Sequence, residues 1–330
     1  MQGLSSPKRF SSVRKVIVSV FTVRILGSSS ATPAFSRFTS AQVVNYSDRF
    51  YLIDAGEGVQ MQLQRYKIKY SRIDGIFISH LHGDHILGIP GLLASLSIFE
   101  RSAPLPIYAP AGLHDILEVL FLHSETQLKY ELEFHALEDF ASGGVIFETE
   151  RMQVKSFPLS HNTFCRGFVF AEKNKRRKFN FYRAKELGIP KEYFHLIKQE
   201  RDITLPDGRE IPADDVLFPR EAPLSYAYCS DTSPDDAILP FIEEVSLLYH
   251  ESTFLDNLRE RARQTFHSTA REAGEVAARA RVKKLLIGHF SARYRDLDPL
   301  LNEAKKEFAN TELATQGLVY DLRKDGRAKK

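Results

Sequence analysis

The sequence predicts a layered α/β fold, in which two sheets pack on each other and helices cover their outer faces. Short apolar segments that suit strands occur in two groups along the 330-residue chain, and segments that suit helices accompany each group. The chain has 43% hydrophobic residues and no internal repeat, so it can form a sizeable core in one large domain or two ordinary ones.

The predicted strands are short runs rich in Val, Ile, Leu, Phe or Tyr. They cover residues 22–27, 42–46, 50–56, 75–80, 105–110, 145–149, 152–161, 225–232, 245–251 and 284–290. Helices are predicted over residues 58–66, 90–100, 112–121, 235–244 and 269–281. The last of these begins with Thr269 and Glu272, which have the spacing of a capping box. We expect residues 1–20 to form a short, disordered extension and residues 21–330 to form the folded domain.

Composition excludes several classes of protein. The net charge of +3 is too small for a polycation, so any nucleic-acid surface must be local. Cys165 and Cys229 cannot staple a chain of this size, and we expect them to stay reduced in the cytoplasm. Since no apolar run reaches the ~18–20 residues that span a bilayer, no membrane segment is expected.

Residues 173–223 differ from the rest of the chain because they are polar, charged and poor in strand signals. The segment begins with a basic cluster, which is followed by aromatic residues. The cluster consists of Lys173, Lys175, Arg176, Arg177 and Lys178. Such a mixture suits a phosphate backbone and unpaired bases. An ordinary solvated surface insertion has the same composition, so the residues alone leave both interpretations open.

The predicted strand at 75–80 ends in an unusual polar group. His80, His82, Asp84 and His85 fall within six positions. Buried polar groups cost several kcal/mol unless they are hydrogen-bonded, paired or bound to a cation. One ion could not easily take all four ligands at such short separations, which indicates two neighbouring metal sites. The alternative is a solvated loop with accidental histidines.

Three more residues of metal-binding types lie where predicted strands end: His161, Asp231 and His289. Strand ends at one edge of an α/β sheet converge, so these side chains are expected to join the first group. Five imidazoles and two carboxylates without a thiolate favour two Zn²⁺ ions, with Mn²⁺ or Fe²⁺ as alternatives. Two ions about 3.5–4 Å apart can lower the pKa of a bridging water toward ~7. Asp84 could then accept the proton of that water as it attacks.

Four other residues are candidates to support this chemistry. His267 precedes the predicted helix at 269–281 and could donate a proton to a leaving oxygen, with Glu251 orienting it. Asp54 and His250 also end strands and are candidates to orient metal ligands. We expect the remaining histidines to be structural or exposed; they are His114, His123, His135 and His195.

Several stretches, in order across residues 22–295, together resemble a known family. They are LGSSSATP, DAGEGVQMQ, SHLHGDHILGIPGLL, CSDTSP, HESTF, HSTAREAG and GHFSARY. HLHGDH with the downstream His161, Asp231 and His289 resembles the metallo-β-lactamase superfamily. Within that superfamily, HESTF, HSTA and HFSARY resemble the ribonuclease Z family. Its members are endonucleases that remove 3′ trailers from precursor tRNA.

The resemblance implies a metallo-β-lactamase-like four-layer αβ/βα sandwich, a homodimer, and an inserted, protruding arm at about 173–223 that grips tRNA. It implies one zinc held by His80, His82 and His161, and a second held by Asp84, His85 and His289, with Asp231 bridging. Asp84 would be the base and His267 would assist the leaving 3′ oxygen. The cut would then follow the discriminator base and leave a 3′-hydroxyl.

The chain departs from the family pattern in an early loop that is thought to sense the tRNA 3′ end. Phe35 and Phe38 stand where relatives carry Lys and Asn, while Arg37 is retained as an RNA-binding candidate. Two other functions remain as alternatives. The first is a hydrolase of a small phosphodiester, sulfate or lactone, which would have no use for a charged arm. The second is a tRNA-binding protein with structural metals, which would need neither Asp84 nor His267.

Overall fold

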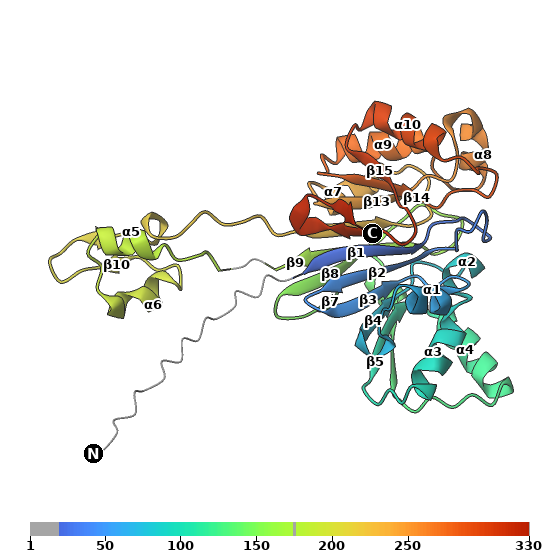
Figure 1. The fold of residues 1–330 in the computed structure, drawn as a ribbon, viewed down its shortest axis with the longest axis horizontal. Helices are drawn as coiled ribbons and strands as arrows, with labels where there is room; N and C mark the ends of the chain where they lie inside the picture. Colours follow the sequence, from blue (N-terminus) through green and yellow to red (C-terminus); the bar gives the residue numbers. More distant parts are fainter. Residues whose placement is uncertain (1–19, 174–175, 330) are drawn as a thin grey trace, which may run out of the picture.

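The computed structural model describes residues 20–173 and 176–329. Two sheets pack face to face and helices cover both outer faces, which gives a four-layer αβ/βα sandwich (Figure 1). The predicted layered α/β fold is therefore confirmed. Residues 1–19, which hold nearly all of the expected extension, lie outside the described part of the chain.

The first sheet has eight strands in the order β17-β16-β1-β2-β3-β4-β5-β6. Their bounds are β1 (Phe21–Gly27), β2 (Ala41–Tyr46), β3 (Arg49–Ile53), β4 (Ile73–Phe77), β5 (Leu105–Ala109), β6 (Leu132–Ala136), β16 (Val319–Asp321) and β17 (Arg327–Lys329). Three helices cover its outer face: α1 (Val59–Arg65), α3 (Ile89–Ile98) and α4 (Gly112–His123). The short helix α2 (Gly83–Ile86) lies between β4 and α3 in the chain.

The second sheet has seven strands in the order β15-β14-β13-β12-β9-β8-β7. Their bounds are β7 (Gly144–Glu148), β8 (Met152–Pro158), β9 (Arg166–Glu172), β12 (Ser225–Cys229), β13 (Leu247–Glu251), β14 (Leu285–Gly288) and β15 (Thr311–Leu313). The helices on its side are α7 (Leu239–Ile242), α8 (Arg259–Gln264), α9 (Ala270–Arg279) and α10 (Asp298–Glu307). No helix in residues 20–173 or 176–329 is long and apolar enough to cross a membrane.

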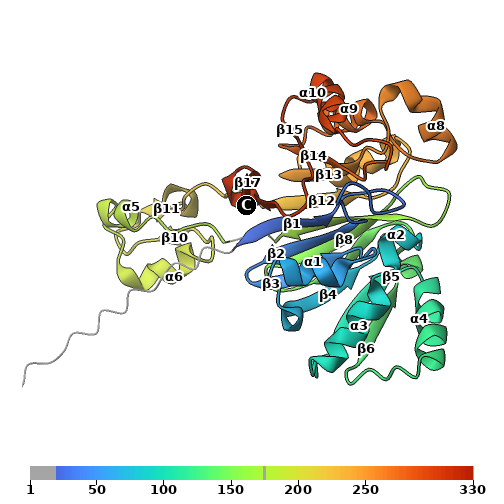
Figure 2. The ribbon, with the colours of Figure 1, turned by 45° about the vertical axis from the view of Figure 1, so that its right-hand side comes forward.

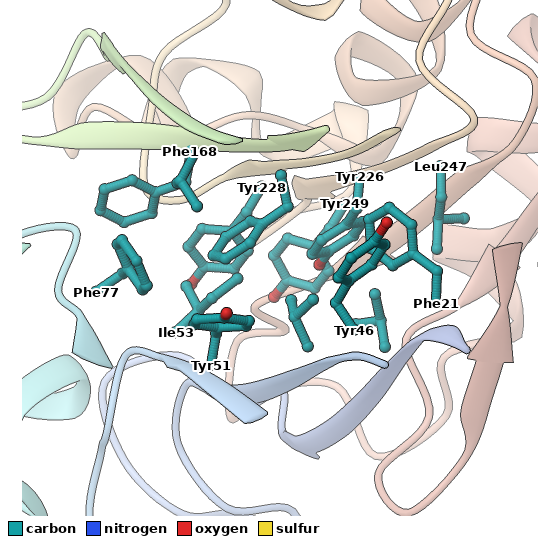
Figure 3. Packing of buried hydrophobic residues seen from close by; sticks show 14 of the residues in the cluster. Phe21, Tyr46, Tyr51, Ile53, Phe77, Phe168, Tyr226, Tyr228, Leu247 and Tyr249 are labelled. Atoms are coloured by element: carbon teal, nitrogen blue, oxygen red, sulfur yellow. The ribbon is translucent and has the colours of Figure 1, made fainter. Parts of the chain in front are cut away.

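Aromatic side chains fill the space between the two sheets (Figure 3). The ring of Phe77 stacks on that of Tyr108 with centroids 4.9 Å apart, and Tyr228 stacks on Tyr249 at 5.0 Å. In β4, Phe77 points into this layer while its neighbour Ile76 packs against the helices of the first sheet. Because both faces of the sheet are covered here, the chain from Ile76 through Phe77 to Ile78 is a fully buried apolar run.

Residues 176–223 leave the body between β9 and β12 and protrude from it (Figures 1 and 2). They contain α5 (Phe181–Glu186), α6 (Phe194–Ile197) and the paired strands β10 (Ile203–Thr204) and β11 (Glu210–Ile211). These elements enclose a hydrophobic cluster of their own, which includes Ile189, Ile197 and Val216. The segment is thus a small folded unit, and its short helices and strands were not predicted.

The predicted helix at 235–244 is shorter in the structure. Asp235 caps a single 3-10 turn, and α7 ends at Ile242. Glu244 has a φ of 54°, which no helix accommodates, and this left-handed residue turns the chain toward β13.

A candidate dinuclear metal centre

All seven predicted metal ligands lie together at one edge of the two sheets. They follow β4, β8, β12 and β14, whose ends meet there. Their ligand atoms fall into groups that could each hold an ion, since the atoms within a group lie within 4.8 Å of one another. The groups include His80, His82, His161 and Asp231, and also Asp84, His85 and His289.

The first group surrounds one point. His82 Nδ1 lies 3.1 Å from His80 Nε2 and 3.3 Å from His161 Nε2. Ligands arranged tetrahedrally at about 2.0–2.1 Å from one ion are ~3.3 Å apart, so this spacing fits a single Zn-sized cation. Asp231 Oδ2 adds a fourth ligand atom 3.5 Å from His80 Nε2.

The second group is linked to the first through Asp231. Asp84 Oδ2 lies 3.3 Å from His289 Nε2 and 3.5 Å from His85 Nε2. Asp231 Oδ1 lies 3.2 Å from His289 Nε2 and 3.4 Å from His85 Nε2. Asp231 therefore presents one oxygen to each group, which is the arrangement of a bridging carboxylate.

Two buried atoms in the centre have no other partner among the described residues. His85 Nε2 and Asp231 Oδ1 make no hydrogen bond with acceptable geometry. Leaving such groups buried and unsatisfied costs about 1–3 kcal/mol each. A cation between them would satisfy both, so the donor set fits a pair of divalent metal ions. Cys165 is not part of it, because its thiol contacts the Asp231 carbonyl and burial raises its pKa.

The electrostatics of the centre favour bound cations. Burial lowers the pKa values of His80 and His161, which keeps both imidazoles neutral and able to ligate. Burial alone would raise the pKa of Asp231, yet the surrounding imidazoles hold it well below its usual range. Burial also lowers the pKa of His85, but the carboxylates of Asp84, Asp231 and Asp54 outweigh that effect and raise it. The same concentrated negative charge would stabilise a metal ion.

Asp54 lies behind His85 and fixes the orientation of its ring. Asp54 Oδ2 accepts hydrogen bonds from His85 Nδ1 at 2.8 Å and from the Tyr228 hydroxyl at 2.7 Å. Asp54 Oδ1 accepts from the Ser79 amide at 2.7 Å. With Nδ1 held in this way, Nε2 of His85 faces the centre, and these contacts support the orienting role expected of Asp54.

His267 and Glu251 form a pair beside the centre. His267 Nδ1 lies 2.8 Å from Glu251 Oε1, and the His267 ring is 5.4 Å from the rings of both His161 and His289. Burial lowers the pKa of His267, but the Glu251 carboxylate more than compensates and raises it to about 9. The predicted capping box of Thr269 and Glu272 is present at the start of α9 and fixes the chain just after His267.

The prediction for His250 is not supported by its position. Side chains alternate along β13, and His250 is paired in register with Cys229 and Ile287, which pack on the helix side of the sheet. Its Nδ1 lies 2.7 Å from the Glu251 carbonyl oxygen. None of its hydrogen bonds among the described residues reaches a predicted metal ligand, so His250 does not orient one.

The four histidines without a predicted role lie away from the centre. His114 and His123 are on α4, and His195 is on α6. His135 is on β6, where its ring stacks on Tyr108 at 4.6 Å.

Sequence reasoning missed several groups that hold the ligands in place. Ser79 Oγ lies 3.0 Å from His80 Nδ1, and Thr253 Oγ1 lies 2.9 Å from His289 Nδ1. The Phe266 carbonyl accepts from His161 Nδ1 at 3.0 Å, and the Ala31 amide donates to Asp84 Oδ2 at 2.7 Å. The two hydroxyls stand beside ligands or in HESTF and could have been suspected, whereas the backbone groups leave no signal in the sequence.

The predicted basic cluster lies at the base of the arm, and much of it is paired with acids. Lys173 contacts Glu148, Lys178 contacts Glu221, and Arg177 contacts Asp214 and nearby carbonyls. Arg176 is exposed, and Lys175 lies outside the described residues. Other exposed cations stand farther out on the arm: Lys185, Lys191, Lys198 and Arg201.

Arg37 lies in the loop that approaches the centre through Ala31. Its guanidinium donates to the Tyr294 carbonyl at 2.7 Å. The loop therefore connects the end of β1 to the segment that follows His289.

The chain is similar to known proteins over most of its length. A family model described as Anti-Pycsar protein Apyc1 matches residues 21–181, a stretch that holds five of the seven predicted ligands. The ribonuclease Z of Porphyromonas gingivalis is 41% identical over 305 residues, which covers 92% of this chain and 100% of that protein. The short form of human tRNase Z is 28% identical in sequence and superposes with a TM-score of 0.66, covering 90% of this chain and 98% of the human one.

The sandwich and its centre define the class of protein. The metallo-β-lactamase fold protein YhfI from Bacillus subtilis superposes with a TM-score of 0.65 at 21% identity, covering 92% of this chain and 99% of its own. This chain thus has the metallo-β-lactamase fold. It belongs to the ribonuclease Z family, and it is an endoribonuclease.

Proposed function

We propose that the chain is a zinc-dependent endoribonuclease that removes the 3′ trailer of precursor tRNA after the discriminator base. The observation that carries the proposal is the dinuclear centre with the His267–Glu251 pair beside it. This arrangement could supply metal ligands, a proton acceptor and a proton donor within one site. A hydrolase of small phosphodiesters could use the same centre, but the folded arm favours a large substrate.

The proposed metal ligands divide between two zinc ions. His80, His82 and His161 would hold the first ion, while Asp84, His85 and His289 would hold the second. Asp231 would contribute one oxygen to each ion. When bound, the two ions would supply Lewis acidity toward phosphate oxygens and would make a water molecule acidic enough to attack at neutral pH.

The protein groups then move two protons. Burial raises the pKa of Asp84, but the imidazoles of His85 and His289 outweigh this effect and hold it below its usual range, so the carboxylate is ionised. It accepts a proton from the water whose oxygen bonds to phosphorus. As the bond between phosphorus and the 3′ oxygen breaks, His267 donates a proton to that oxygen. The products are a tRNA with a 3′-hydroxyl and a trailer with a 5′-phosphate.

The test is incubation of the zinc-loaded protein with a precursor tRNA that carries a 3′ trailer, with the cut mapped to the nucleotide. We expect a single cut after the discriminator base. Hydrolysis of bis(p-nitrophenyl) phosphate without any cleavage of the precursor would contradict the proposed substrate and would favour the small-phosphodiester alternative.

Replacing Glu251 with Gln should shift the pH dependence of cleavage. The Glu251 carboxylate raises the pKa of His267 to about 9, and loss of the Glu251 charge lets that pKa fall toward the ordinary value of about 6.5. The alkaline limb of the rate profile should therefore move down by one pH unit or more. Bound cations would lower the pKa of His267 in both proteins, so the difference between the two profiles is the readout.

Glu272→Gln provides the matched control, because Glu272 is a nearby buried carboxylate that caps α9 instead of contacting His267. Its profile should coincide with that of the native protein. Identical profiles for Glu251→Gln and the native enzyme would show that His267 is not the proton donor.

We propose that the chain forms a homodimer through the outer face of the helices that cover the first sheet. Several large apolar side chains on or just after α3 and α4 are exposed, and contact with a second chain would bury them. They are Ile98, Phe99, Ile116, Val119, Leu120 and Leu122. We expect Leu122→Asp to halve the molecular mass in solution, while Glu118→Lys on the same helix leaves it unchanged. A native protein that sedimented as a monomer would refute this proposal.

We also place the enzyme in the cytoplasm. Both cysteines, Cys165 and Cys229, are buried and unpaired. A chain whose cysteines form no disulfide suits a reducing compartment.

A further inference from the structure

Two exposed phenylalanines lie in segments whose backbone atoms contact the proposed metal ligands Asp84 and His161. Phe35 is 50% exposed and Phe266 is 41% exposed. Their φ angles are 51° and 56°, a backbone conformation that residues with bulky side chains rarely adopt. Neither ring belongs to any of the hydrophobic clusters formed by the described residues. The strain at these positions is therefore not offset by burial of the ring.

Phe35 occupies the tip of a tight turn. The Ala34 amide donates to the Arg37 carbonyl at 3.1 Å, and the Arg37 amide donates to the Ala34 carbonyl at 2.9 Å. Phe35 and Ser36 between them both have positive φ, as in a two-residue type I′ turn. Such turns strongly prefer Asn-Gly. Backbone geometry thus disfavours phenylalanine at this position.

The loop that carries this turn contacts one side of the centre. The amide of Ala31 donates to Asp84 Oδ2, and the Arg37 guanidinium donates to the Tyr294 carbonyl. The same guanidinium lies 5.3 Å from the centre of the Phe35 ring. An exposed ring beside a guanidinium cation has the chemistry to receive an unpaired base.

Phe266 follows Thr265, the residue that caps the C-terminal end of α8. Its amide donates to the Arg263 carbonyl and the next amide donates to the Ala262 carbonyl, which is a helix ending that favours glycine. The Phe266 carbonyl holds His161, and the following residue is His267. Phe266 is therefore tied to the His80, His82 and His161 group, whereas the Phe35 turn is tied to Asp84 of the other group.

We propose that Phe266 stacks on the discriminator base and that Phe35 stacks on the first base of the trailer. The inference rests on the proposed function. His267 protonates the 3′ oxygen of the discriminator nucleotide, so that nucleotide lies on the side of Phe266. The trailer then continues across the centre toward Phe35 and Arg37. Stacking accepts any base because every base has a π-face, which suits trailers of differing sequence.

The experiment is a double-mutant cycle between ring and base. The cycle measures how fast the native enzyme, Phe35→Ala and Phe266→Ala each cleave three precursor tRNAs. One precursor is intact, one lacks the discriminator base, and one lacks the first trailer base. Stacking on an aromatic side chain contributes about 1–3 kcal/mol per base, so either ring removal should lower kcat/KM on the intact precursor at least about fivefold.

The predicted coupling is specific to position. Loss of the discriminator base should slow the native enzyme but not slow Phe266→Ala any further. Loss of the first trailer base should likewise slow the native enzyme but not slow Phe35→Ala any further. Phe35→Trp and Phe266→Trp should restore the rate on the precursor, and the alanine variants should lose more precursor cleavage than hydrolysis of bis(p-nitrophenyl) phosphate. Phe218→Ala removes a comparably exposed ring at the base of the arm and should couple to neither position.

The inference would be overturned if removing both ring and base lowered kcat/KM by the product of the two separate losses. It would also be overturned if Phe266 coupled to the first trailer base and Phe35 to the discriminator base. An equal loss of small-phosphodiester hydrolysis would also overturn it, because the rings would then support the centre itself. If the native enzyme hydrolyses the small ester but leaves the intact precursor uncut, the proposed function fails and this inference fails with it.

Discussion

Replacing Asp84 with Ala should lower the rate of RNA cleavage by about 10³-fold or more, while precursor tRNA still binds with nearly native affinity. The large effect is expected because one carboxylate has two proposed roles. Its Oδ2 lies within reach of His85 and His289 as a ligand of the second ion, and it accepts the proton of the attacking water. Loss of a general base alone costs about 10²–10⁴-fold.

The measurements are single-turnover cleavage and equilibrium binding of the same labelled precursor. Asp84→Asn distinguishes loss of the ligand and base roles from loss of packing. Its side chain has nearly the same shape, and the amide oxygen can still accept a hydrogen bond from the Ala31 amide. It should be nearly as inactive as the alanine variant. Cleavage near the native rate by either variant would exclude Asp84 as base and ligand.

Removing the arm should raise the KM for precursor tRNA by about 100-fold or more and leave hydrolysis of bis(p-nitrophenyl) phosphate unchanged. The structure indicates where to cut, since the Phe218 amide donates to the Lys178 carbonyl at 2.8 Å and the two chains run side by side there. A two-residue Asn-Gly turn can join Lys178 to Phe218 without disturbing β9 or β12. The hydrophobic cluster that is lost belongs to the arm alone.

A milder variant tests whether charge or shape matters. Removing the exposed cations Lys185, Lys191, Lys198 and Arg201 keeps the fold of the arm and should weaken binding, with a shallower dependence on salt. If deletion of the arm reduced both activities, the arm would be part of the catalytic fold. If deletion reduced neither, the arm would not bind the substrate.

The grouping of the metal-binding side chains was predictable because it follows from local chemistry. A buried apolar strand that ends in several imidazoles and a carboxylate needs a cation, and parallel strands bring their ends to one edge. His80, His161, Asp231 and His289 all stand at such ends. His250 shows where this reasoning fails, because a shift of one residue along a strand moves a side chain to the opposite face.

Other features depend on contacts between residues far apart in the chain. Arg177 pairs with Asp214 and Lys178 with Glu221, and these pairs turn a basic cluster into a partly neutral stalk. The small core of the arm joins residues from 184 to 217 that show no strong periodicity. The Ala31 amide and the Phe266 carbonyl support Asp84 and His161 through backbone atoms, which every residue carries.

We propose that seven side chains hold two zinc ions that the nuclease needs. The most direct test titrates metal-free protein with zinc and follows bound zinc and precursor cleavage in the same samples. We expect cleavage to be absent without metal and to reach its plateau at two zinc ions per chain. His289→Ala, which removes a ligand of the second ion, should bind one ion fewer and remain inactive. Full cleavage by the metal-free protein, or a plateau at two ions in His289→Ala, would contradict the assignment.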